Sequence, residues 1–405
     1  MFGKAKPGEV SPFQAATAAL ASTIGASNIV GVPAAIMFGG PGAIFWMWMM
    51  AIMGMGSKFV EVVLGFKYRE KNAEGEYVGG PMYYMTKGLN MKWLGVIFAF
   101  FLMIELVPSI MVQANSVSSS ALESFNISPL ITGIVTLILV GLVVVGGITR
   151  IGKVTEKLVP LMAGVYFVAA MIIVFANISE VPRVFGLIMS SAFRPMAAVG
   201  GFAGSTIAAS IRWGVARGVY SNEAGMGTAP MAHASATNDH AVRQGFWGIF
   251  EIIADTLIIC STTAFVVLST GIWESPGALE NPSALPAAAF SQFYGPIGGM
   301  IVTISLLLFV VSTIIVIIFY GEKQTEFLFG LKASKVMRYV YLLSIVVGAI
   351  GGAQILWQFL DLLLAFIIFP NMLAIFLLHK EVIVLTKEFF TSEEFYLKDI
   401  SKAKH

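Results

Sequence analysis

Long apolar runs dominate this chain and limit the environments in which it can fold. Ten runs can be counted, and a helix of about 20 apolar residues crosses the roughly 30 Å hydrocarbon core of a bilayer. Of the 405 residues, 57% are hydrophobic and 12% are charged, so a soluble globule would expose large apolar patches. We therefore expect an all-α polytopic membrane protein with ten transmembrane helices. The predicted spans are residues 13–38, 41–66, 93–118, 129–147, 158–178, 199–236, 246–272, 296–320, 337–350 and 353–378.

The positive charges predict how the chain is oriented. Most of the 25 Lys and Arg lie in segments that share the cytoplasmic side if the N-terminus is cytoplasmic, and the opposite segments hold only Arg183 and Arg194. Cytoplasmic loops carry an excess of Lys and Arg. We expect a multi-pass protein of the cell membrane with both termini in the cytoplasm. Charged and apolar residues alternate after the last run, which predicts a cytoplasmic amphipathic tail over 381–405.

The ten spans divide into two sets of five, within residues 1–178 and 179–380. Because five is odd, the second set must cross the membrane in the opposite sense to the first. This is the condition for an inverted repeat, in which substrate and ion sites lie near the membrane midplane between the two halves. The sequence thus predicts a five-plus-five inverted repeat.

The first span of each set is interrupted by polar and glycine-rich residues. Residues 23–28 read TIGASN, and residues 221–227 read SNEAGMG. Backbone N–H and C=O groups that lose helical partners at membrane depth cost several kcal/mol each unless a cavity, water or ligand satisfies them. Two discontinuous helices in corresponding positions predict one central binding site.

The ends of a broken helix offer two kinds of ligand. Free N–H groups of Ala26, Ser27 and Asn28 suit the carboxylate of a zwitterion, whereas the carbonyl of Ile24 suits a small cation such as Na⁺. The alternative is a Gly/Ser kink that only packs closely against a neighbouring helix.

Adjacent hydroxyls in the otherwise apolar eighth span are candidate cation ligands. Ser312 and Thr313 carry hard oxygen atoms that would complete a Na⁺ site beside freed carbonyls. The alternative is a hydrogen bond from each hydroxyl to the carbonyl one turn earlier, which is common in membrane helices.

A few ionisable groups lie within or beside the spans. The candidate proton carriers are Glu105, Glu251, Asp255 and Asp361, or these groups are half-exposed or paired with another helix. Lys58 and Glu61 are one turn apart and predict a local ion pair.

Motifs for catalysis and ATP hydrolysis are missing from the sequence. It contains no H-E-x-x-H, G-x-S-x-G or G-x-x-x-x-G-K-[ST] pattern, so we expect no enzyme and no ATP-driven pump. A formal net charge of +2 also excludes a strongly basic nucleic-acid-binding protein. Energy for uphill transport would come from an ion gradient.

Several stretches resemble one family across nearly the whole chain. They are GGPGAIFWMW at 39–48, GGPMYY at 79–84, GVARGVYSNEAGMGTAP at 214–230, VRQG at 242–245, YGEK at 320–323 and PN at 370–371. The chain resembles the alanine or glycine:cation symporter family, the sodium:alanine symporters. The resemblance implies a leucine-transporter-like fold and Na⁺-coupled uptake of small neutral amino acids, such as alanine or glycine, by alternating access.

The resemblance also implies which residues bind the substrate and the coupling ion. The sodium site would comprise the Ile24 carbonyl with Ser312 and Thr313. The substrate site would comprise Gly25, Ala26, Ser27, Asn28, Gln113, Tyr220, Ser221, Asn222, Gly225 and Gly227.

Three departures from the family keep other functions open. Ala26 and Ser27 stand where the family usually has Thr-Gly, and Ile317 stands where members carry Trp. The family also usually has an additional N-terminal span. The alternatives are an H⁺-coupled transporter, a transporter of altered specificity, and a sensor that binds substrate without transporting it.

Overall fold

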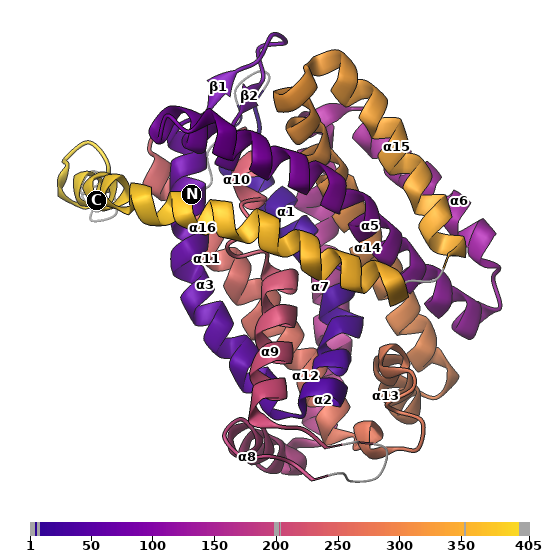
Figure 1. The fold of residues 1–405 in the computed structure, drawn as a ribbon. Coiled ribbons are helices and arrows are strands. Elements are labelled where there is room, and N and C mark those ends of the chain that lie inside the picture. Colours follow the sequence, from indigo (N-terminus) through magenta and orange to yellow (C-terminus); the bar gives the residue numbers. More distant parts are fainter. Residues whose placement is uncertain (1–4, 6–8, 198–201, 203, 352–353, 397–405) are drawn as a thin grey trace, which may run out of the picture.

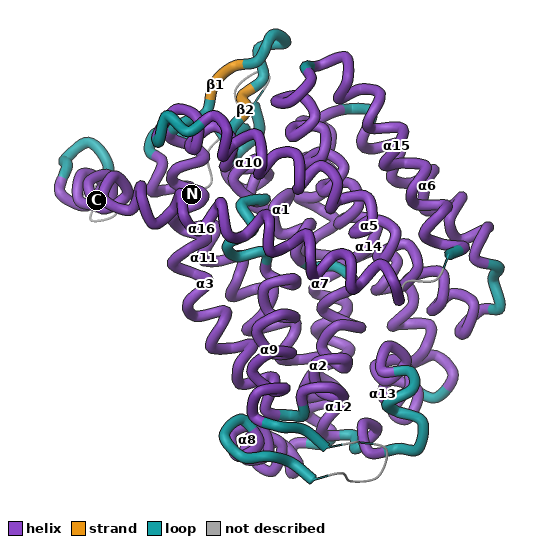
Figure 2. Tube along the Cα trace, viewed as in Figure 1, coloured by secondary structure: helices purple, strands orange, loops and turns teal. Residues whose placement is uncertain are grey.

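The computed structural model describes residues 5, 9–197, 202, 204–351 and 354–396, and most of them are helical (Figure 2). The first part of the chain forms a broken helix followed by long continuous ones. These are α1 (Pro12–Thr23), α2 (Val32–Gly39), α3 (Gly42–Lys67), α5 (Lys92–Phe125), α6 (Pro129–Val144) and α7 (Gly147–Ala176). A small hairpin of β1 (Glu70–Lys71) and β2 (Tyr77–Val78), with the short α4 (Pro81–Tyr83), connects α3 to α5.

The second part of the chain begins with a helix at the end of the bundle opposite the hairpin, α8 (Val181–Ser191) (Figure 1). A second broken helix follows, made of α9 (Ile207–Asn222) and α10 (Ala229–His233). The remaining helices are α11 (Ala241–Ile252), α12 (Ser261–Ser269), α13 (Leu285–Tyr294), α14 (Pro296–Phe329), α15 (Leu331–Ile350) and α16 (Gln354–Thr391).

Many of these helices have the length and composition of membrane spans. Within the described residues seven are long and apolar enough to cross a bilayer, and the bent pair of α1 and α2 raises this number to eight. The predicted fourth span corresponds to the shorter apolar helix α6, and the sixth is divided between α9 and α10. The predicted 199–236 run also includes residues outside the described ones. The chain is therefore a mostly helical protein with several helices that fit membrane spans.

The helices pack in two groups that α1 connects. In one group α3 packs against α9 and α11; in the other α14 packs against α5 and α15 (Figure 1). Glycine allows the close approach within each group, since a Cβ on Gly214 would lie 2.3 Å from the Ala43 carbonyl oxygen and one on Gly348 would lie 2.3 Å from Met111 Cα. α1 contacts α14 of one group and α11 of the other, so α1 lies between the groups.

The C-terminal helix extends further than the sequence suggested. α16 continues without a break to Thr391, so the predicted boundary between residues 380 and 381 falls inside a helix. Glu381 fixes this part of the helix to the end of α3, since its Oε2 accepts from Lys67 Nζ at 2.5 Å and from the Tyr68 hydroxyl at 2.6 Å. Residues 397–405 of the predicted tail lie outside the described residues.

Candidate functional site

The break between α1 and α2 is held open by two side chains. Asn28 Oδ1 accepts from the Gly25 N–H at 2.9 Å, and Gln113 Oε1 accepts from the Ala26 N–H at 3.0 Å. These bonds replace the helical ladder, and the chain continues as a π-helical turn over Ser27–Gly31 with a bend of 44°. The first predicted break is thus present, and it brings Gln113 of α5 to the amides of α1.

The two carbonyls freed by this break turn toward α14. In a continuous helix Ala21 and Ile24 would each accept from the N–H four residues ahead, but those donors are bonded elsewhere. Thr313 Oγ1 donates to the Ala21 oxygen at 2.9 Å and to the Ile24 oxygen at 3.2 Å. Three hard oxygen atoms therefore converge on one buried point. The Ala21 carbonyl was missed from the sequence because Ala21 lies before the polar interruption at residues 23–28, within a stretch expected to be regular helix.

Ser312, the other predicted cation ligand, has its hydroxyl turned away from this point. Its Oγ donates to the Phe309 carbonyl at 2.8 Å and lies 3.3 Å from Met162 Sδ. This bond to the carbonyl one turn earlier is the alternative considered above.

The second predicted break, between α9 and α10, is closed by protein groups. α9 ends where Glu223 adopts a left-handed backbone with φ of 55°. Lys58 Nζ donates to the freed Asn222 carbonyl at 2.8 Å, and Asn371 Nδ2 donates to the Gly225 carbonyl at 2.8 Å. The carbonyls of this break are therefore satisfied from α3 and α16.

A small cavity lies where α1, α5, α9 and α14 meet. Its volume is about 20 Å³, room for roughly one water molecule, so side chains nearly fill this point. Ser27, Gln113 and Tyr220 of the predicted substrate site line it together with Thr313. The other lining residues were not among the predicted substrate and sodium ligands, although the sequence marked Glu105 as a candidate proton carrier and Ile317 as a departure from the family. They are Ser22, Glu105, Leu106, Ser109, Glu223, Met226, Thr228 and Ile317.

Asp255 joins the two breaks beside this cavity. Its carboxylate accepts from Asn28 Nδ2 at 2.6 Å, from the Ser221 hydroxyl at 2.9 Å and from the Thr256 hydroxyl at 2.7 Å. Asp255 lies in a π-helical stretch between α11 and α12. Asn28 and Ser221, both predicted to lie in the substrate site, thus contact the same carboxylate. In the sequence, Asp255 is only an isolated acidic residue within an apolar run.

The other predicted residues of the second break face away from the cavity. Asn222 Nδ2 donates to the Thr256 hydroxyl at 3.1 Å. A Cβ on Gly227 would lie 2.3 Å from Pro81 Cγ, and one on Gly225 would lie 3.3 Å from Met372 Sδ. These glycines, both with positive φ, permit the turn and the approach of α4 and α16.

A buried ionic network lies next to the second break. Lys58 is 3.6 Å from Glu251, whose Oε1 is 2.6 Å from His233 Nε2, while Glu61 Oε1 accepts from Asn371 Nδ2 at 2.7 Å. The local Lys58–Glu61 ion pair expected from the sequence is therefore replaced by contacts to other helices, because both side chains point into a packed interior rather than along the surface of α3.

A wider cleft of about 680 Å³ is lined by residues of α2, α5 and α9 and by the segment that leads into α13. It is lined by Gly31 of the π-helical turn, by Asn115, and by Arg212, Trp213 and Arg217 of α9. A Cβ on Gly31 would lie 3.5 Å from Ser27 Cβ, and Ser27 lines the small cavity, so the cleft reaches the neighbourhood of that cavity. It provides an approach from the side of the loops that are free of Lys and Arg.

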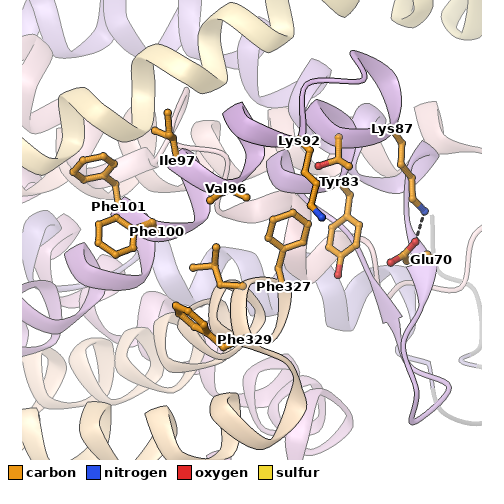
Figure 3. Close-up of a pocket in the computed structure, with 12 residues that line it drawn as sticks. Glu70, Tyr83, Lys87, Lys92, Val96, Ile97, Phe100, Phe101, Phe327 and Phe329 are labelled. Atoms are coloured by element: carbon orange, nitrogen blue, oxygen red, sulfur yellow. Dashed lines mark ion pairs between the residues drawn. The ribbon is translucent and has the colours of Figure 1, made fainter.

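The groove shown in Figure 3, of about 700 Å³, lies elsewhere. Phe100, Phe101 and Phe327 form its apolar part, and an ion pair between Lys87 and Glu70 lies at its polar end (Figure 3). None of its lining residues belongs to either helix break. It is therefore a groove on the outside of the bundle, separate from the candidate site.

Comparison with known proteins identifies the family. The chain matches the sodium:alanine symporter family over residues 1–402. The chain belongs to this family. Within it, the uncharacterized transporter YflA of Bacillus subtilis (strain 168) is 60% identical over 404 residues, covering 99% of this chain and 86% of the relative. The sodium/alanine symporter AgcS of Methanococcus maripaludis is 42% identical over 387 residues, which cover 94% of this chain and 84% of that relative.

Solved structures with the same fold support the family assignment. MhsT in complex with L-phenylalanine superposes with a TM-score of 0.67 at 13% identity, covering 93% of this chain and 90% of that one. A Na⁺-coupled sialic acid symporter gives a TM-score of 0.65 at 12% identity, and the match covers 91% of this chain and 79% of that one. The expected leucine-transporter-like fold is confirmed, and this family and fold are those of membrane transporters rather than enzymes.

Proposed function

We propose that this member of the sodium:alanine symporter family couples Na⁺ entry to the uptake of a small neutral amino acid, such as alanine or glycine. The observation that carries the proposal is the convergence of the freed Ala21 and Ile24 carbonyls on the Thr313 hydroxyl, directly beside the closed cavity. Discontinuous helices in transporters use their carbonyl ends for Na⁺ and their N–H ends for substrate carboxylates. The described residues hold both ends at one place.

The donor set fits a sodium ion. Carbonyl and hydroxyl oxygens are hard ligands, which suit small hard cations. Ala21, Ile24 and Thr313 would hold the ion, and Ser312 would join them if its hydroxyl rotated away from the Phe309 carbonyl. A bound Na⁺ would supply positive charge that draws α1 and α14 together next to the substrate.

The substrate carboxylate would bind at the first break. Gln113 Oε1 already accepts from the Ala26 N–H, so a carboxylate oxygen would take over this position while the Gln113 amide N–H groups donate to it. Gly25 keeps the approach open, because a Cβ there would lie 3.1 Å from Gln113 Nε2. Ser27, Asn28 and the second-break residues Tyr220 to Gly227 would complete the surroundings.

The two packing groups support transport by alternating access. We infer a ten-span inverted repeat, with residues 1–178 and 179–380 as its halves, and both termini in the cytoplasm of the cell. The group containing α3, α9 and α11 would rock against the group containing α5, α14 and α15, with the broken α1 between them. The cleft beside Arg212 and Arg217 would be the outer pathway.

Uptake of labelled alanine and glycine into proteoliposomes tests this function. An inward Na⁺ gradient is expected to drive accumulation, whereas equal Na⁺ on both sides, or a proton gradient alone, is not. Accumulation driven by protons without Na⁺ would reject the coupling ion. Binding with Na⁺-dependent thermal stabilisation but without counterflow would instead identify a sensor.

A further inference from the structure

The groove on the outside of the bundle changes from apolar to charged along its length (Figure 3). Phe100 of α5 and Phe327 of α14 belong to its apolar part. Lys92 lies between these rings and the ion pair of Lys87 with Glu70 (Figure 3). The volume of about 700 Å³ is within the range of pockets that hold small molecules. A ligand with an apolar part and a charged head would match both ends.

The apolar part of the groove faces the surroundings of the bundle. Ile97 and Phe100 are 37% and 43% exposed, although α5 is apolar enough to cross a membrane. Phe101 is held in place, because its ring stacks on Phe366 of α16 with 4.6 Å between centroids. Exposed apolar side chains on a spanning helix contact hydrocarbon, where an extended protein segment would leave its backbone N–H and C=O groups unpaired. An acyl chain has no such groups and can fill the groove.

The length of the groove along α5 matches one leaflet of a bilayer. Its lining residues on this helix run from Lys92 to Phe101, and nine residues of helix extend about 13.5 Å. Half of the hydrocarbon core is about 15 Å thick. Trp93, next to Lys92, is 60% exposed, and tryptophan is enriched at the membrane–water interface. A lipid with its head beside Lys92 would therefore have the ends of its chains near the depth of Phe101.

The charged end of the groove favours an anionic head group. Lys92 is exposed and forms no ion pair or hydrogen bond with any residue that the structure describes. Lys87 pairs with Glu70, but the two side chains are 41% and 45% exposed, and exposed ion pairs are weak enough to exchange partners. With two lysines and one acid, the lining carries one net positive charge. This charge complements the single negative charge of a phospholipid such as phosphatidylglycerol.

We propose that this groove binds one anionic phospholipid of the membrane, with its phosphate at Lys92 and Lys87 and an acyl chain along the aromatic wall. Phosphatidylcholine would fill the apolar part equally well, but it carries no net charge for the lysines to attract. Since α5 and α14 belong to the same packing group, the lipid would stabilise this group as a unit. The site is separate from both helix breaks, so the inference does not depend on the proposed function.

Thermal unfolding of the full chain in detergent micelles tests the proposal, with phosphatidylglycerol or phosphatidylcholine added in increasing amounts. Each lysine near an anionic lipid contributes roughly fivefold to its affinity. Because one acid opposes the two lysines, we expect half-maximal stabilisation at an about fivefold lower concentration of phosphatidylglycerol than of phosphatidylcholine. Native mass spectrometry should retain one phosphatidylglycerol per chain. Equal half-maximal concentrations for the two lipids would overturn the proposal.

Charge variants in the groove should change this lipid preference in opposite directions. Lys92→Gln should lower the affinity for phosphatidylglycerol roughly fivefold, whereas Glu70→Gln should raise it, because Lys87 then has no competing acid. Lys153→Gln is the matched control, since Lys153 is also exposed but lies on α7, outside the groove. An unchanged preference in Lys92→Gln, or an equal loss in Lys153→Gln, would show that the groove does not select the lipid.

A blocking variant tests the apolar part of the groove without changing its charge. Val96 is 38% exposed in the wall that α5 forms, so the indole of Val96→Trp would fill the groove and should abolish the stabilisation by phosphatidylglycerol. Val168→Trp is the control, because Val168 is 58% exposed on α7, outside the groove. Full stabilisation of Val96→Trp would place the lipid elsewhere and reject the site. If this variant does not fold, the Lys92 and Glu70 variants decide.

Discussion

The Thr313 hydroxyl donates to the Ala21 carbonyl across 292 residues of sequence, at 2.9 Å, and so joins α14 to the open end of α1. This contact exists because the N–H that would normally bind Ala21 is held by Asn28. The same geometry leaves the Ile24 oxygen within 3.2 Å of the hydroxyl. The most direct predictions concern this contact and its neighbours.

Removing the hydroxyl should weaken sodium binding. We expect Thr313→Ala to raise the Na⁺ concentration for half-maximal thermal stabilisation by about tenfold or more. The reason is that one polar contact to a charged group contributes about 1.5–3 kcal/mol. Thr313→Ser keeps the oxygen and should stay near the unmodified protein. Equal Na⁺ affinity in the alanine and serine variants would remove Thr313 from the ion site.

A methyl group at Gly25 should separate α1 from its partners. The added Cβ would lie 2.7 Å from Thr313 Oγ1 and 3.1 Å from Gln113 Nε2, so these side chains or their helices must shift. Gly25→Ala should therefore lose Na⁺-dependent binding of amino acids, measured by thermal shift. Gly164→Ala is the matched control, because nothing lies within 4 Å of its added Cβ. Normal binding in the Gly25 variant would show that this approach is not required.

Asn28 should be coupled energetically to Asp255. Its side chain accepts from the Gly25 N–H and donates to Asp255 at 2.6 Å, so Asn28→Ala leaves a buried carboxylate short of a donor. We expect loss of amino-acid binding and a destabilisation of about 1–3 kcal/mol. A double-mutant cycle with Asp255→Asn, followed by thermal unfolding in detergent, measures the coupling. Additive effects of the two substitutions would argue against a shared role.

Lys58 should matter far more for stability than a surface lysine. It is fully buried, 3.6 Å from Glu251 and 2.8 Å from the Asn222 carbonyl, so Lys58→Met leaves both acceptors without their donor. Breaking a buried pair in this way costs about 3–5 kcal/mol. Lys67→Met is the comparison, since its partly exposed pair with Glu381 contributes at most about 1 kcal/mol. Similar unfolding temperatures for the two variants would contradict a structural role for the buried pair.

Local composition was sufficient to predict the helix breaks. Glycine, serine and asparagine within an apolar run cannot sustain a helix at membrane depth without other partners, and α1 ends at Thr23 and α9 at Asn222, inside the predicted interruptions. The hydroxyl of Thr313 was likewise visible as a polar group in an otherwise apolar helix. The polarity and helix propensity of single residues, compared with those of their neighbours in the chain, are therefore enough to predict where a membrane helix breaks.

Partners across the bundle required the tertiary structure. The sequence paired Lys58 with Glu61 one turn away, but the structure pairs Lys58 with Glu251 on another helix. It also did not reveal that the Ala21 carbonyl would meet Thr313, or that Glu105 would enter the cavity without a donor. Helices that are apolar on every side, because lipid and protein interior are both apolar, carry little pattern to show which face meets which neighbour. Local hydrogen-bonding chemistry therefore determined where this chain breaks its helices, and only the packing of those helices decided which groups the breaks bring together.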